Sequence, residues 1–456
     1  MFSNTQIQQL KKYLLLSAFL LVLLHAFSIF RGYEGDMFCW YEWGKMIFTN
    51  GLGSVYRTNT DYLPLSHYFL GIYVAFQSSV EGVVAYIEYF KLIPLIVHFI
   101  AGYFVVKLIE KDRDEKHPIR KSLFYLLNIP ILYNAIVWGQ VDIIFSCLVF
   151  ISYYCAVNER ITLSLVLCIA AVNFKLQAVI FLPVLILMLL PLMRKNYSLK
   201  ALAKWIFIPL LFQALILLPY LLDGSIDRVW AVVTESFGKY PRISLKAYNI
   251  WHLLFPNLRV EDPDTLVFAG ITFRNWGLLM FFMTSFLALF PLLKSLYTSL
   301  GTRTYITLPV EKTLLIFGLI PLLFFYFNTE MHERYSHPAI IFIIIYGIRT
   351  NKPILPFMAT WCYFFNLEGA LHAFHIDNYG TVIFHPIFLS SLWLLVIIGL
   401  FLNLYAIGSG FSITKAHRDT VNTWFRNLKS SVQPLINYVN NVKQWKRYLL
   451  LSVVVG

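Results

Sequence analysis

Residues 13–30 read YLLLSAFLLVLLHAFSIF, an apolar run of the length needed to cross the roughly 30 Å hydrocarbon core of a bilayer. Only a short polar start with Lys11 and Lys12 precedes it, and similar runs recur along the whole sequence. A cleaved signal peptide is the alternative, but the run is long and lacks a small-residue cleavage site. Together with the many later runs, it predicts a retained anchor at the start of a polytopic membrane protein.

The composition supports the same class. Of 456 residues, 58% are hydrophobic and only 13% are charged, whereas a soluble protein carries about 25% charged residues. The formal net charge of +13 would suggest nucleic-acid binding in a soluble chain. Here the excess Lys and Arg lies in short loops and the C-terminal tail, where cytoplasmic positive charge is expected. We therefore expect a membrane-lipid environment and no nucleic-acid partner.

Charge bias orients the expected spans. Lys11 and Lys12 place the N-terminus in the cytoplasm, and the charged loop 111–121 belongs on the same side. This arrangement requires 31–90 to form a long first outer loop with interfacial helices. Within that loop, 63–80 must lie on the outer face without crossing the membrane.

The later apolar runs alternate across the membrane and complete the predicted topology. They give about twelve spans, so that 1–407 forms an all-α integral membrane bundle. A basic cytoplasmic tail, 408–456, follows and could form an interfacial helix. The sequence shows no internal repeat and no nucleotide-binding glycine motif, which argues against a nucleotide-driven pump.

The unusual polar strings fall on the predicted outer side, whereas the cytoplasmic loops are short and basic. We therefore expect the chemistry on the outer face, within 34–61, 138–142, 173–177, 239–251 and 328–335.

Two acids of the first outer loop are candidates for chemistry. Asp36 follows the first span closely and could take a proton from an attacking hydroxyl, although an ordinary solvated loop acid is the alternative. Asp61 precedes Pro64, which is also the pattern of a helix start with a capping acid.

Polar residues at the ends of apolar runs form the next two candidates. Gln140 and Asp142 follow Trp138 at the mouth of a span, where they either line an aqueous cavity or cap the following helix. Lys175, close to Gln177, could reach the interface by snorkelling or present its charge to a lipid phosphate.

The string 330–337 (EMHERYSH) is the densest charged patch against an apolar run. His332 and Arg334 are suited to hold an anionic phosphate, while an interfacial ionic anchor is the alternative. The spacing of His332 and His337 is not the i, i+4 spacing of a helical zinc site, so we predict no metal here. We interpret His372, His375, Asp377 and His385 as loop residues.

Taken in order, these strings resemble the GT-C polytopic glycosyltransferases that use polyprenyl-phosphate-linked sugars. Within that group they are most similar to the dolichyl-phosphate-glucose glucosyltransferases of N-glycan assembly and to bacterial relatives labelled mannosyltransferases. The resemblance covers about 30–340 and rests on Asp36, 61–65 (DYLPL), 138–142 (WGQVD), 174–177 (FKLQ), 244–251 (SLKAYNIW) and 332–334 (HER). Leu63 stands where the family has a proline, and Arg334 where the eukaryotic enzymes more often have lysine.

The resemblance implies a role for each matching residue. Asp36 would be the catalytic base, and His332, Arg334 and Lys175 would hold the donor phosphate. The remaining matches would shape the sugar and acceptor pocket: Asp61, Trp138, Gln140, Asp142, Gln177, Asn249, Trp251 and Glu333.

The function implied is that of an inverting, metal-independent and cofactor-free transferase. It would move glucose or mannose from a polyprenyl-phosphate donor to a hydroxyl acceptor, which is a lipid-linked glycan, another lipid or a protein. The reaction would take place on the extracytoplasmic or lumenal side of a bacterial plasma membrane or the endoplasmic reticulum. The alternatives are a polytopic transporter of a lipid or small solute, which would favour ionisable groups at span centres and repeated halves, and a non-catalytic lipid-binding protein.

Overall fold

The computed structural model describes residues 4–28, 31–236, 238–302 and 307–406, and the predicted tail 408–456 lies outside this part of the chain. Residues up to 404 belong to one compact unit. Its helices are α1 (Asn4–Ser28), α2 (Glu34–Asn50), α3 (Pro64–Val74), α4 (Val80–Ala85), α5 (Leu92–Glu110), α6 (Pro118–Leu126), α7 (Ile129–Leu132), α8 (Asp142–Val157), α9 (Ile161–Phe174), α10 (Leu182–Lys195), α11 (Leu199–Leu222), α12 (Ile226–Thr234), α13 (Ile250–Leu254), α14 (Phe273–Thr302), α15 (Val310–Phe327), α16 (His337–Thr350), α17 (Ile354–Leu371) and α18 (Pro386–Ala406).

Short elements complete the description. They are the 3-10 helices η1 (Leu52–Arg57), η2 (Ile87–Lys91), η4 (Leu176–Phe181), η5 (Pro256–Leu258) and η6 (Val382–Phe384), and the π-helix η3 (Tyr133–Trp138). Two small sheets are present as well. β1 (Ser244–Leu245) pairs in parallel with β4 (Met331–His332), and β2 (Val267–Phe268) pairs antiparallel with β3 (Ile271–Thr272).

The apolar helices define the class of the protein. Within the described residues, seven helical stretches have the length and composition to cross a membrane: Gln6–Ala26, Ile87–Glu110, Leu176–Lys195, Leu199–Leu222, Phe273–Gly301, Val310–Phe327 and Pro386–Ala406. A helix satisfies its own backbone hydrogen bonds, as a lipid environment requires. The chain is therefore a membrane-embedded protein of the predicted α-helical class, with almost no sheet.

The number of spans is less fully defined than the class. Four shorter apolar helices, Ile129–Trp138, Asp142–Val157, Ile161–Phe174 and His337–Thr350, accompany the seven long ones in the described residues. The predicted count of about twelve spans stays a prediction. In the first loop, α3 has 11 residues, fewer than the roughly 17 that a crossing needs, and its place on the outer face also stays a prediction.

The bundle interior is built from α5, α8, α9, α15 and α16. α8 contacts α5, α9 and α16, and α15 contacts α16. Large aromatic side chains fill the interfaces, for example Phe317 of α15 and Phe342 of α16, whose ring centroids are 5.2 Å apart. Such pairs bury large apolar areas and fix how neighbouring helices pack.

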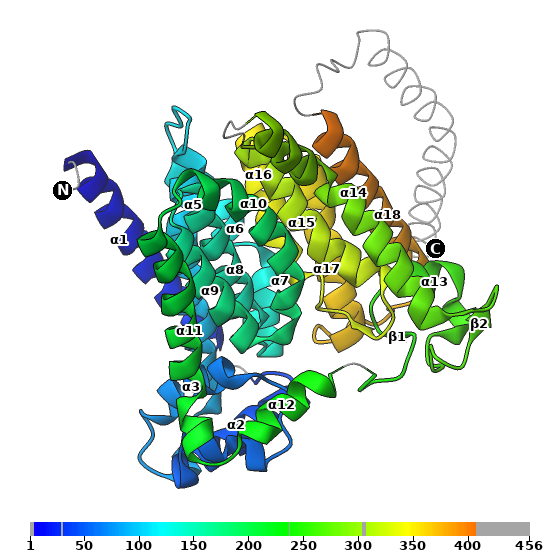
Figure 1. Cartoon of the computed structure of the whole chain (residues 1–456). Helices are drawn as coiled ribbons and strands as arrows, with labels where there is room; N and C mark the ends of the chain where they lie inside the picture. The colour runs from blue at the N-terminus through cyan, green and yellow to red at the C-terminus, as the bar shows by residue number, and fades with distance from the viewer. Residues whose placement is uncertain (1–3, 29–30, 237, 303–306, 407–456) are drawn as a thin grey trace, which may run out of the picture. The chain divides into compact units, whose positions relative to one another are not determined.

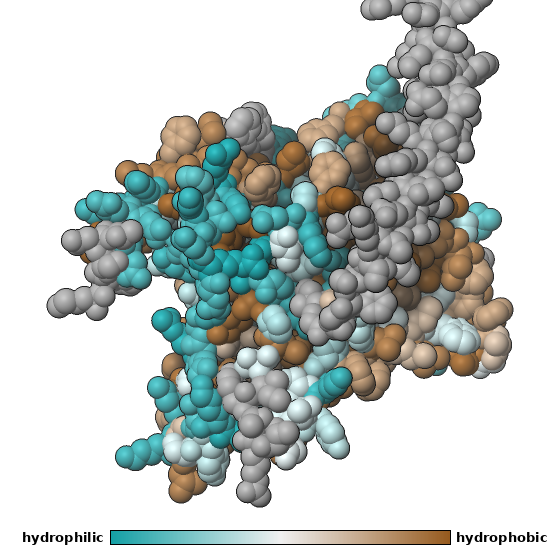
Figure 2. Space-filling model, turned by 90° about the horizontal axis from the view of Figure 1, so that it is seen from above, coloured by the Kyte–Doolittle hydropathy of each residue, from teal (hydrophilic) through white to brown (hydrophobic). Residues whose placement is uncertain are grey.

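One end of the bundle carries the basic loops. The Lys111 Nζ donates to Asn158 Oδ1 at 3.2 Å, and Lys195 pairs with Glu159 at 2.9 Å. Three chain segments that the sequence placed on the cytoplasmic side therefore meet at one end. Figure 2 views the bundle from this end and shows hydrophilic residues gathered there, with apolar residues on the flanks.

A partly buried carboxylate stabilises the same end. Glu311, at the start of α15, accepts from Arg113 at 2.7 Å and from Arg349 Nε at 2.9 Å. Arg349 is only 3% exposed and also donates to the carbonyl of Lys111 at 3.0 Å. A carboxylate shared by two guanidinium groups ties the loop after α5 to the end of α16.

The opposite end holds α2, α3, α12 and β1, as Figure 1 shows. Here Arg57 pairs with Asp223 at 2.7 Å and joins η1 to the end of α11. The parallel pairing of Ser244 with Met331 brings the long loop after α12 beside the loop after α15. Polar strings distant in sequence therefore gather at this end, away from the basic loops.

If the bundle spans the membrane, its two ends face opposite compartments. We expect Asp114→Cys and Glu261→Cys, introduced singly into a Cys39→Ser background, to be labelled by a membrane-impermeant maleimide from opposite sides of sealed vesicles. Asp114 lies in the loop after α5 and Glu261 in the loop before α14, and both side chains are exposed. Labelling of both positions from the same side would contradict this topology.

Candidate functional site

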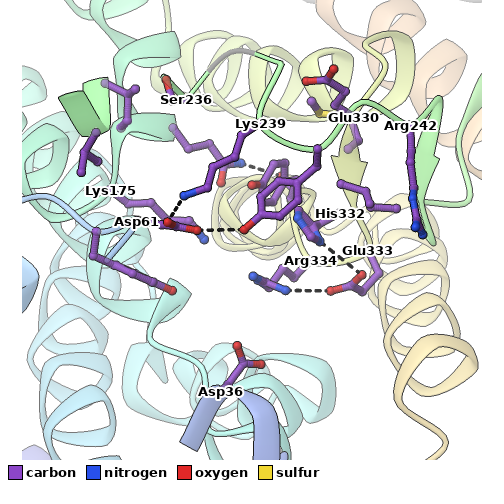
Figure 3. A pocket seen from close by; sticks show the side chains of 18 of the residues that line it. Asp36, Asp61, Lys175, Ser236, Lys239, Arg242, Glu330, His332, Glu333 and Arg334 are labelled. Carbon is purple, nitrogen blue, oxygen red and sulfur yellow. Dashed lines mark hydrogen bonds and ion pairs between the residues drawn. The ribbon is translucent and has the colours of Figure 1, made fainter. Parts of the chain in front are cut away.

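A cavity of about 1740 Å³ opens at the α2 end of the bundle. The predicted site residues among those that line it are Asp36, Asp61, Trp138, Lys175, Gln177, His332, Glu333 and Arg334. They come from widely separated segments: the start of α2, the loop before α3, η3, the junction of α9 with η4, and the loop between α15 and α16. Figure 3 shows Asp36, Asp61, Lys175 and Arg334 around a common space.

Asp36 lies in the first turn of α2, where a negative charge is favoured by the helix dipole. The Trp138 Nε1–H donates to its Oδ2 at 2.6 Å. Within the described residues, no side chain or backbone N–H donates a hydrogen bond to Oδ1. One carboxylate oxygen is thus held in place, while the other remains to accept a proton from a ligand in the cavity.

The loop that carries Trp138 is fixed tightly against α2. Gly139 has φ +84°, a conformation that favours glycine, and a Cβ at this position would come within 2.6 Å of Met37 Sδ. The Tyr33 N–H donates to the Trp138 carbonyl at 2.9 Å. The glycine of the WGQVD string therefore permits the close approach that lets Trp138 reach Asp36.

A buried cluster of three charges lies beside Asp36. Asp142, which is 1% exposed, pairs with Lys175, and its second oxygen lies 3.6 Å from Arg334 Nε. The 3.6 Å separation is too long for a hydrogen bond. Arg334 Nε and Asp142 Oδ2 are both buried without a hydrogen-bond partner in the described residues. Donor capacity therefore remains on Arg334.

Lys175 is surrounded by aromatic rings. Its Nζ lies 5.3 Å from the ring centroid of Tyr335, 5.6 Å from that of Phe145 and 5.9 Å from that of Tyr62. Ring faces attract a cation and exclude water from it. The lysine is thus held rigidly with 14% of its side chain exposed, instead of snorkelling along a lipid-facing surface.

Glu333 contacts the two residues beside it in the sequence, His332 and Arg334. It is 4% exposed, accepts from Arg334 Nη1 at 2.9 Å and lies 3.8 Å from His332 Nδ1. Burial alone would raise its pKa, but the interaction with His332 and the charge of Arg334 hold the pKa of Glu333 at about 2. The nearby carboxylates raise the pKa of Arg334, so Glu333 and Arg334 both stay charged at neutral pH.

Asp61 belongs to the cavity but is already paired. It accepts from Lys239 and, at 2.8 Å, from the Tyr240 hydroxyl. Its backbone does not cap α3, because the N-cap of that helix is Leu63 and the helix starts at Pro64. The helix-cap alternative for Asp61 is therefore wrong, and the acid instead ties the first loop to the loop after α12.

Gln177 and Gln140 support the walls through hydrogen bonds. Gln177 Nε2 donates to the Tyr335 carbonyl at 3.0 Å, and Gln140 Oε1 accepts from the Tyr62 hydroxyl at 3.2 Å. Gln140 and Asp142 do not line the cavity, so they act from behind its surface.

Asn249 and Trp251 also stand behind the wall. Asn249 caps α13 by accepting from the Trp251 N–H, and its amide donates to the Phe325 and Asn328 carbonyls. The Trp251 Nε1–H donates to the Phe327 carbonyl at 2.9 Å. Because neither side chain lines the cavity, direct sugar contact does not fit this placement. Their contacts instead secure the end of α15, just before the 332–334 string.

Several cavity residues were assigned no role from the sequence, although four of them lie within 239–251, where chemistry was expected. They are mostly basic and come from the long loop after α12 and its surroundings: Lys239, Tyr240, Arg242, Lys246, Arg259 and Arg274. The recurrence of Lys and Arg in a loop placed on the outer side, against the usual charge bias, was a signal that could have identified them.

A second buried carboxylate, Glu368 of α17, was also missed. It is fully buried and accepts from the hydroxyls of Tyr133 and Tyr379 and from the Phe374 N–H at 2.9 Å. Tyr133 begins the π-helix that ends at Trp138. Single π-turns are frequent at functional sites. Glu368 therefore anchors the element that delivers Trp138 to Asp36.

Within the described residues, no group of three or more His, Cys, Asp and Glu side chains has the arrangement to hold a metal ion. His337, for example, forms a hydrogen bond with the Tyr363 hydroxyl, which lies 2.8 Å from its Nδ1.

We predict that Glu333→Gln lowers thermal stability in a pH-dependent way. Because the folded-state pKa is depressed, the ionised carboxylate stabilises the fold above the ordinary glutamate pKa, and this contribution is lost as pH falls toward about 2. The difference in unfolding midpoint between wild type and variant in detergent should be constant from pH 6 to 8. It should shrink clearly at pH 3, and a difference unchanged at pH 3 would contradict the assignment.

We expect Glu368→Gln to destabilise the protein by about 1–3 kcal/mol, because the amide leaves buried hydrogen-bond donors without their acceptor. Glu261→Gln, at an exposed glutamate, is the matched control and should change stability little. Thermal unfolding in detergent measures both. Equal stability of the two variants would show that the Glu368 contacts do not secure the fold.

No protein-family model matches the chain, and no curated protein sequence matches it. Its function is therefore inferred from the geometry and charge of the cavity and from the short strings that line it.

Proposed function

We propose that the chain is an inverting glycosyltransferase that moves a hexose, glucose or mannose, from a polyprenyl-phosphate donor to a hydroxyl acceptor. The observation that carries the proposal is the meeting of Asp36 with Lys175 and Arg334 around one cavity. This reaction needs a base and a site for the leaving phosphate. The carboxylate with one free oxygen supplies the base, and the two fixed cations supply the phosphate site. The resemblance of the lining strings to GT-C glycosyltransferases favours the same chemistry.

Asp36 is assigned the role of general base. The acceptor hydroxyl gives its proton to Asp36 while its oxygen attacks the anomeric carbon of the donor sugar. The new C–O bond forms as the bond from the anomeric carbon to the phosphate oxygen breaks, which inverts the configuration. The hydrogen bond from Trp138 at 2.6 Å holds the carboxylate in one orientation during this step.

Lys175 and Arg334 are assigned to the leaving phosphate. The departing polyprenyl phosphate gains negative charge and needs no protonation, so fixed cations stabilise it. Both are held in position by Asp142 or Glu333 and therefore need no reorganisation when charge develops. His332, 3.8 Å from Glu333, lies next to them and can donate a further hydrogen bond.

The donor phosphate enters a site that already contains carboxylates. Asp142 and Glu333 balance the formal charges of Lys175 and Arg334. The N–H groups of Lys175 and Arg334 that these carboxylates do not use then favour binding by directed hydrogen bonds over simple charge attraction. This arrangement limits the affinity for free phosphate while it retains contacts to a phosphate placed by its lipid tail.

Apolar residues give the lipid tail a path. Part of the cavity is lined by Leu176, Val179 and Ile180 of η4, with Leu278 of α14 and Phe324 of α15. Val179 and Leu278 are exposed on the bundle surface. The polyprenyl chain is proposed to leave the cavity here and continue into the bilayer, since burial of each methylene is worth about 0.8 kcal/mol.

The site is proposed to face the extracytoplasmic or lumenal side of the plasma membrane or the endoplasmic reticulum. It lies at the end of the bundle opposite the basic loops of 111–121 and 158–160. Lys and Arg in short loops favour the cytoplasm. No metal and no cofactor are assigned to the proposed reaction.

We predict that Asp36→Asn lowers the rate of hexose transfer by about 10²–10⁴-fold, since the amide cannot accept the proton. Purified protein in detergent is incubated with radiolabelled polyprenyl-phosphate-glucose or polyprenyl-phosphate-mannose and a membrane extract as acceptor. Glu34→Gln is the matched control, because Glu34 lies in the same turn of α2 but is exposed and outside the cavity.

Activity of Asp36→Asn equal to that of wild type would remove Asp36 from the mechanism. Absence of transfer by wild type from both donors, in protein that still unfolds cooperatively, would favour the transporter or lipid-binding alternative.

A further inference from the structure

A second group of cations lines the cavity away from the proposed donor phosphate. It consists of Arg242, Lys246 and Arg259, together with His252, and is referred to below as the basic wall. Figure 3 shows Arg242 on the far side of His332 from Asp36 and Asp61. The proposed chemistry uses none of these four residues.

The basic wall is built by the backbone of the long outer loop. The Ser244 N–H donates to the Arg259 carbonyl at 3.0 Å, and the Ile243 N–H donates to the Glu261 carbonyl at 2.9 Å. Arg242, Ser244 and Lys246 all line the cavity, and Lys246 does so from a left-handed backbone conformation with φ +63°. The loop thus presents its basic side chains to the cavity and buries Ile243 on the other side.

In the part of the chain that the structure describes, these cations lack the carboxylate partners that five other cations of the cavity have. Arg57, Lys175, Lys239, Arg274 and Arg334 each pair with a carboxylate. Within the described residues, neither Arg242 nor Arg259 has a carboxylate partner, and Lys246 donates only to the Ala370 carbonyl, at 2.9 Å. Glu235, at the end of α12, is an acid that lines the same cavity, but it pairs with none of them.

His252 adds a buried imidazole side chain to the basic wall. It lines the cavity, is 1% exposed, and its Nδ1 has no hydrogen-bond partner in the described residues. Burial and the charge of Arg259 lower the pKa of His252 to about 4, so its ring is neutral at pH 7. A buried polar atom without a partner is costly unless a ligand satisfies it.

The donor does not account for the basic wall. Its phosphate is one bond from the anomeric carbon, which must lie about 3–3.5 Å from the hydroxyl that Asp36 activates. The phosphate is therefore confined to the side of Asp36, Lys175 and Arg334. The cavity of about 1740 Å³ also exceeds the roughly 300–1,000 Å³ of a pocket for one small molecule, which leaves room for a second saccharide.

We propose that the basic wall binds an acidic saccharide, so that the acceptor glycan carries a carboxylate or phosphate group on its sugar portion. This inference rests on the proposed function, because it assigns the acceptor half of the same cavity. Arg242 and Arg259 bind the anion, Lys246 contributes a further N–H donor, and His252 accepts or donates a hydrogen bond to a neighbouring hydroxyl. Guanidinium groups suit both anions because they donate two parallel hydrogen bonds.

Binding of defined saccharides to the purified full-length protein tests the proposal without requiring turnover. Saturation-transfer NMR in detergent compares methyl β-glucuronide, glucose 6-phosphate and neutral methyl β-glucoside. At least one acid should bind about 10-fold more tightly than the neutral sugar. Comparison of the two acids distinguishes a carboxylate from a phosphate. Equal binding of all three would overturn the proposal.

Variants show where the preference arises. Arg242→Gln with Arg259→Gln should abolish the preference for the acid, whereas Arg242→Lys with Arg259→Lys should retain part of it. Arg120→Gln is the control, because Arg120 is exposed at the other end of the bundle. A preference that survives the double glutamine variant would overturn the proposal, since the anion would then bind elsewhere.

The transfer product separates this inference from the proposed function. Labelled glycan is formed with the membrane extract, released from any lipid diphosphate and applied to an anion exchanger. Retention that is lost after carboxyl reduction or phosphatase treatment supports an acidic acceptor. A labelled but neutral glycan would overturn the acidic acceptor while it supports hexose transfer. If no glycan is labelled, hexose transfer fails, and the binding measurement alone decides whether an acidic saccharide is bound.

Discussion

The site depends on one buried carboxylate, Asp142, at the start of α8. A charge that is 1% exposed in a lipid-embedded bundle is tolerated only when cations reach it. Lys175 does so from the junction of α9 with η4, and Arg334 approaches from the loop before α16. Three segments far apart in the sequence are thereby brought to one point, and their remaining hydrogen-bonding groups face a common cavity. Lys175 and Arg334, which are assigned to the donor phosphate, are thus also the residues whose contacts with Asp142 join the helices.

Asp36 reaches the same point by a different route. The π-helix 133–138 is held at one end by Glu368 through Tyr133 and ends at Trp138, whose indole N–H meets the carboxylate. Gly139 allows the chain to turn against Met37. The proposed base is therefore positioned by the bundle interior, although it lies on a helix of the first loop. Pre-positioned groups of this kind lower the reorganisation that accompanies a reaction.

Local patterns in the sequence predicted the class of the protein and much of the cavity wall. Apolar runs identify membrane helices because a helix satisfies its own backbone in lipid. Short polar strings at the ends of those runs identified Asp36, Trp138, Lys175 and Arg334, since such residues are costly there without a purpose. The same patterns could not separate residues that face the cavity from residues behind it. Asn249 and Trp251 hydrogen-bond to backbone carbonyls near the end of α15, and this depends on tertiary packing.

The roles of the basic wall and of Glu368 were not assigned from the sequence for a related reason. The two loop segments that carry Arg242 and Arg259 are joined by backbone hydrogen bonds, which no periodicity in the sequence indicates. Glu368 sits within an apolar helix, and its partners lie in η3 and the loop after α17. Loops that cross between helices carry no repeating pattern, so their side-chain directions become known only from the folded chain.

The position of a bound polyprenyl phosphate would test directly whether Lys175 and Arg334 form the donor site. A structure of the wild-type protein with polyprenyl phosphate, determined by electron cryomicroscopy in a lipid nanodisc, would locate the phosphate. We expect its oxygens within about 2.7–3.2 Å of Lys175 Nζ and the Arg334 guanidinium, with the tail beside Val179 and Leu278. A phosphate bound at Arg242 and Arg259 instead, or at the end that carries the basic loops, would contradict the assignment of the donor site.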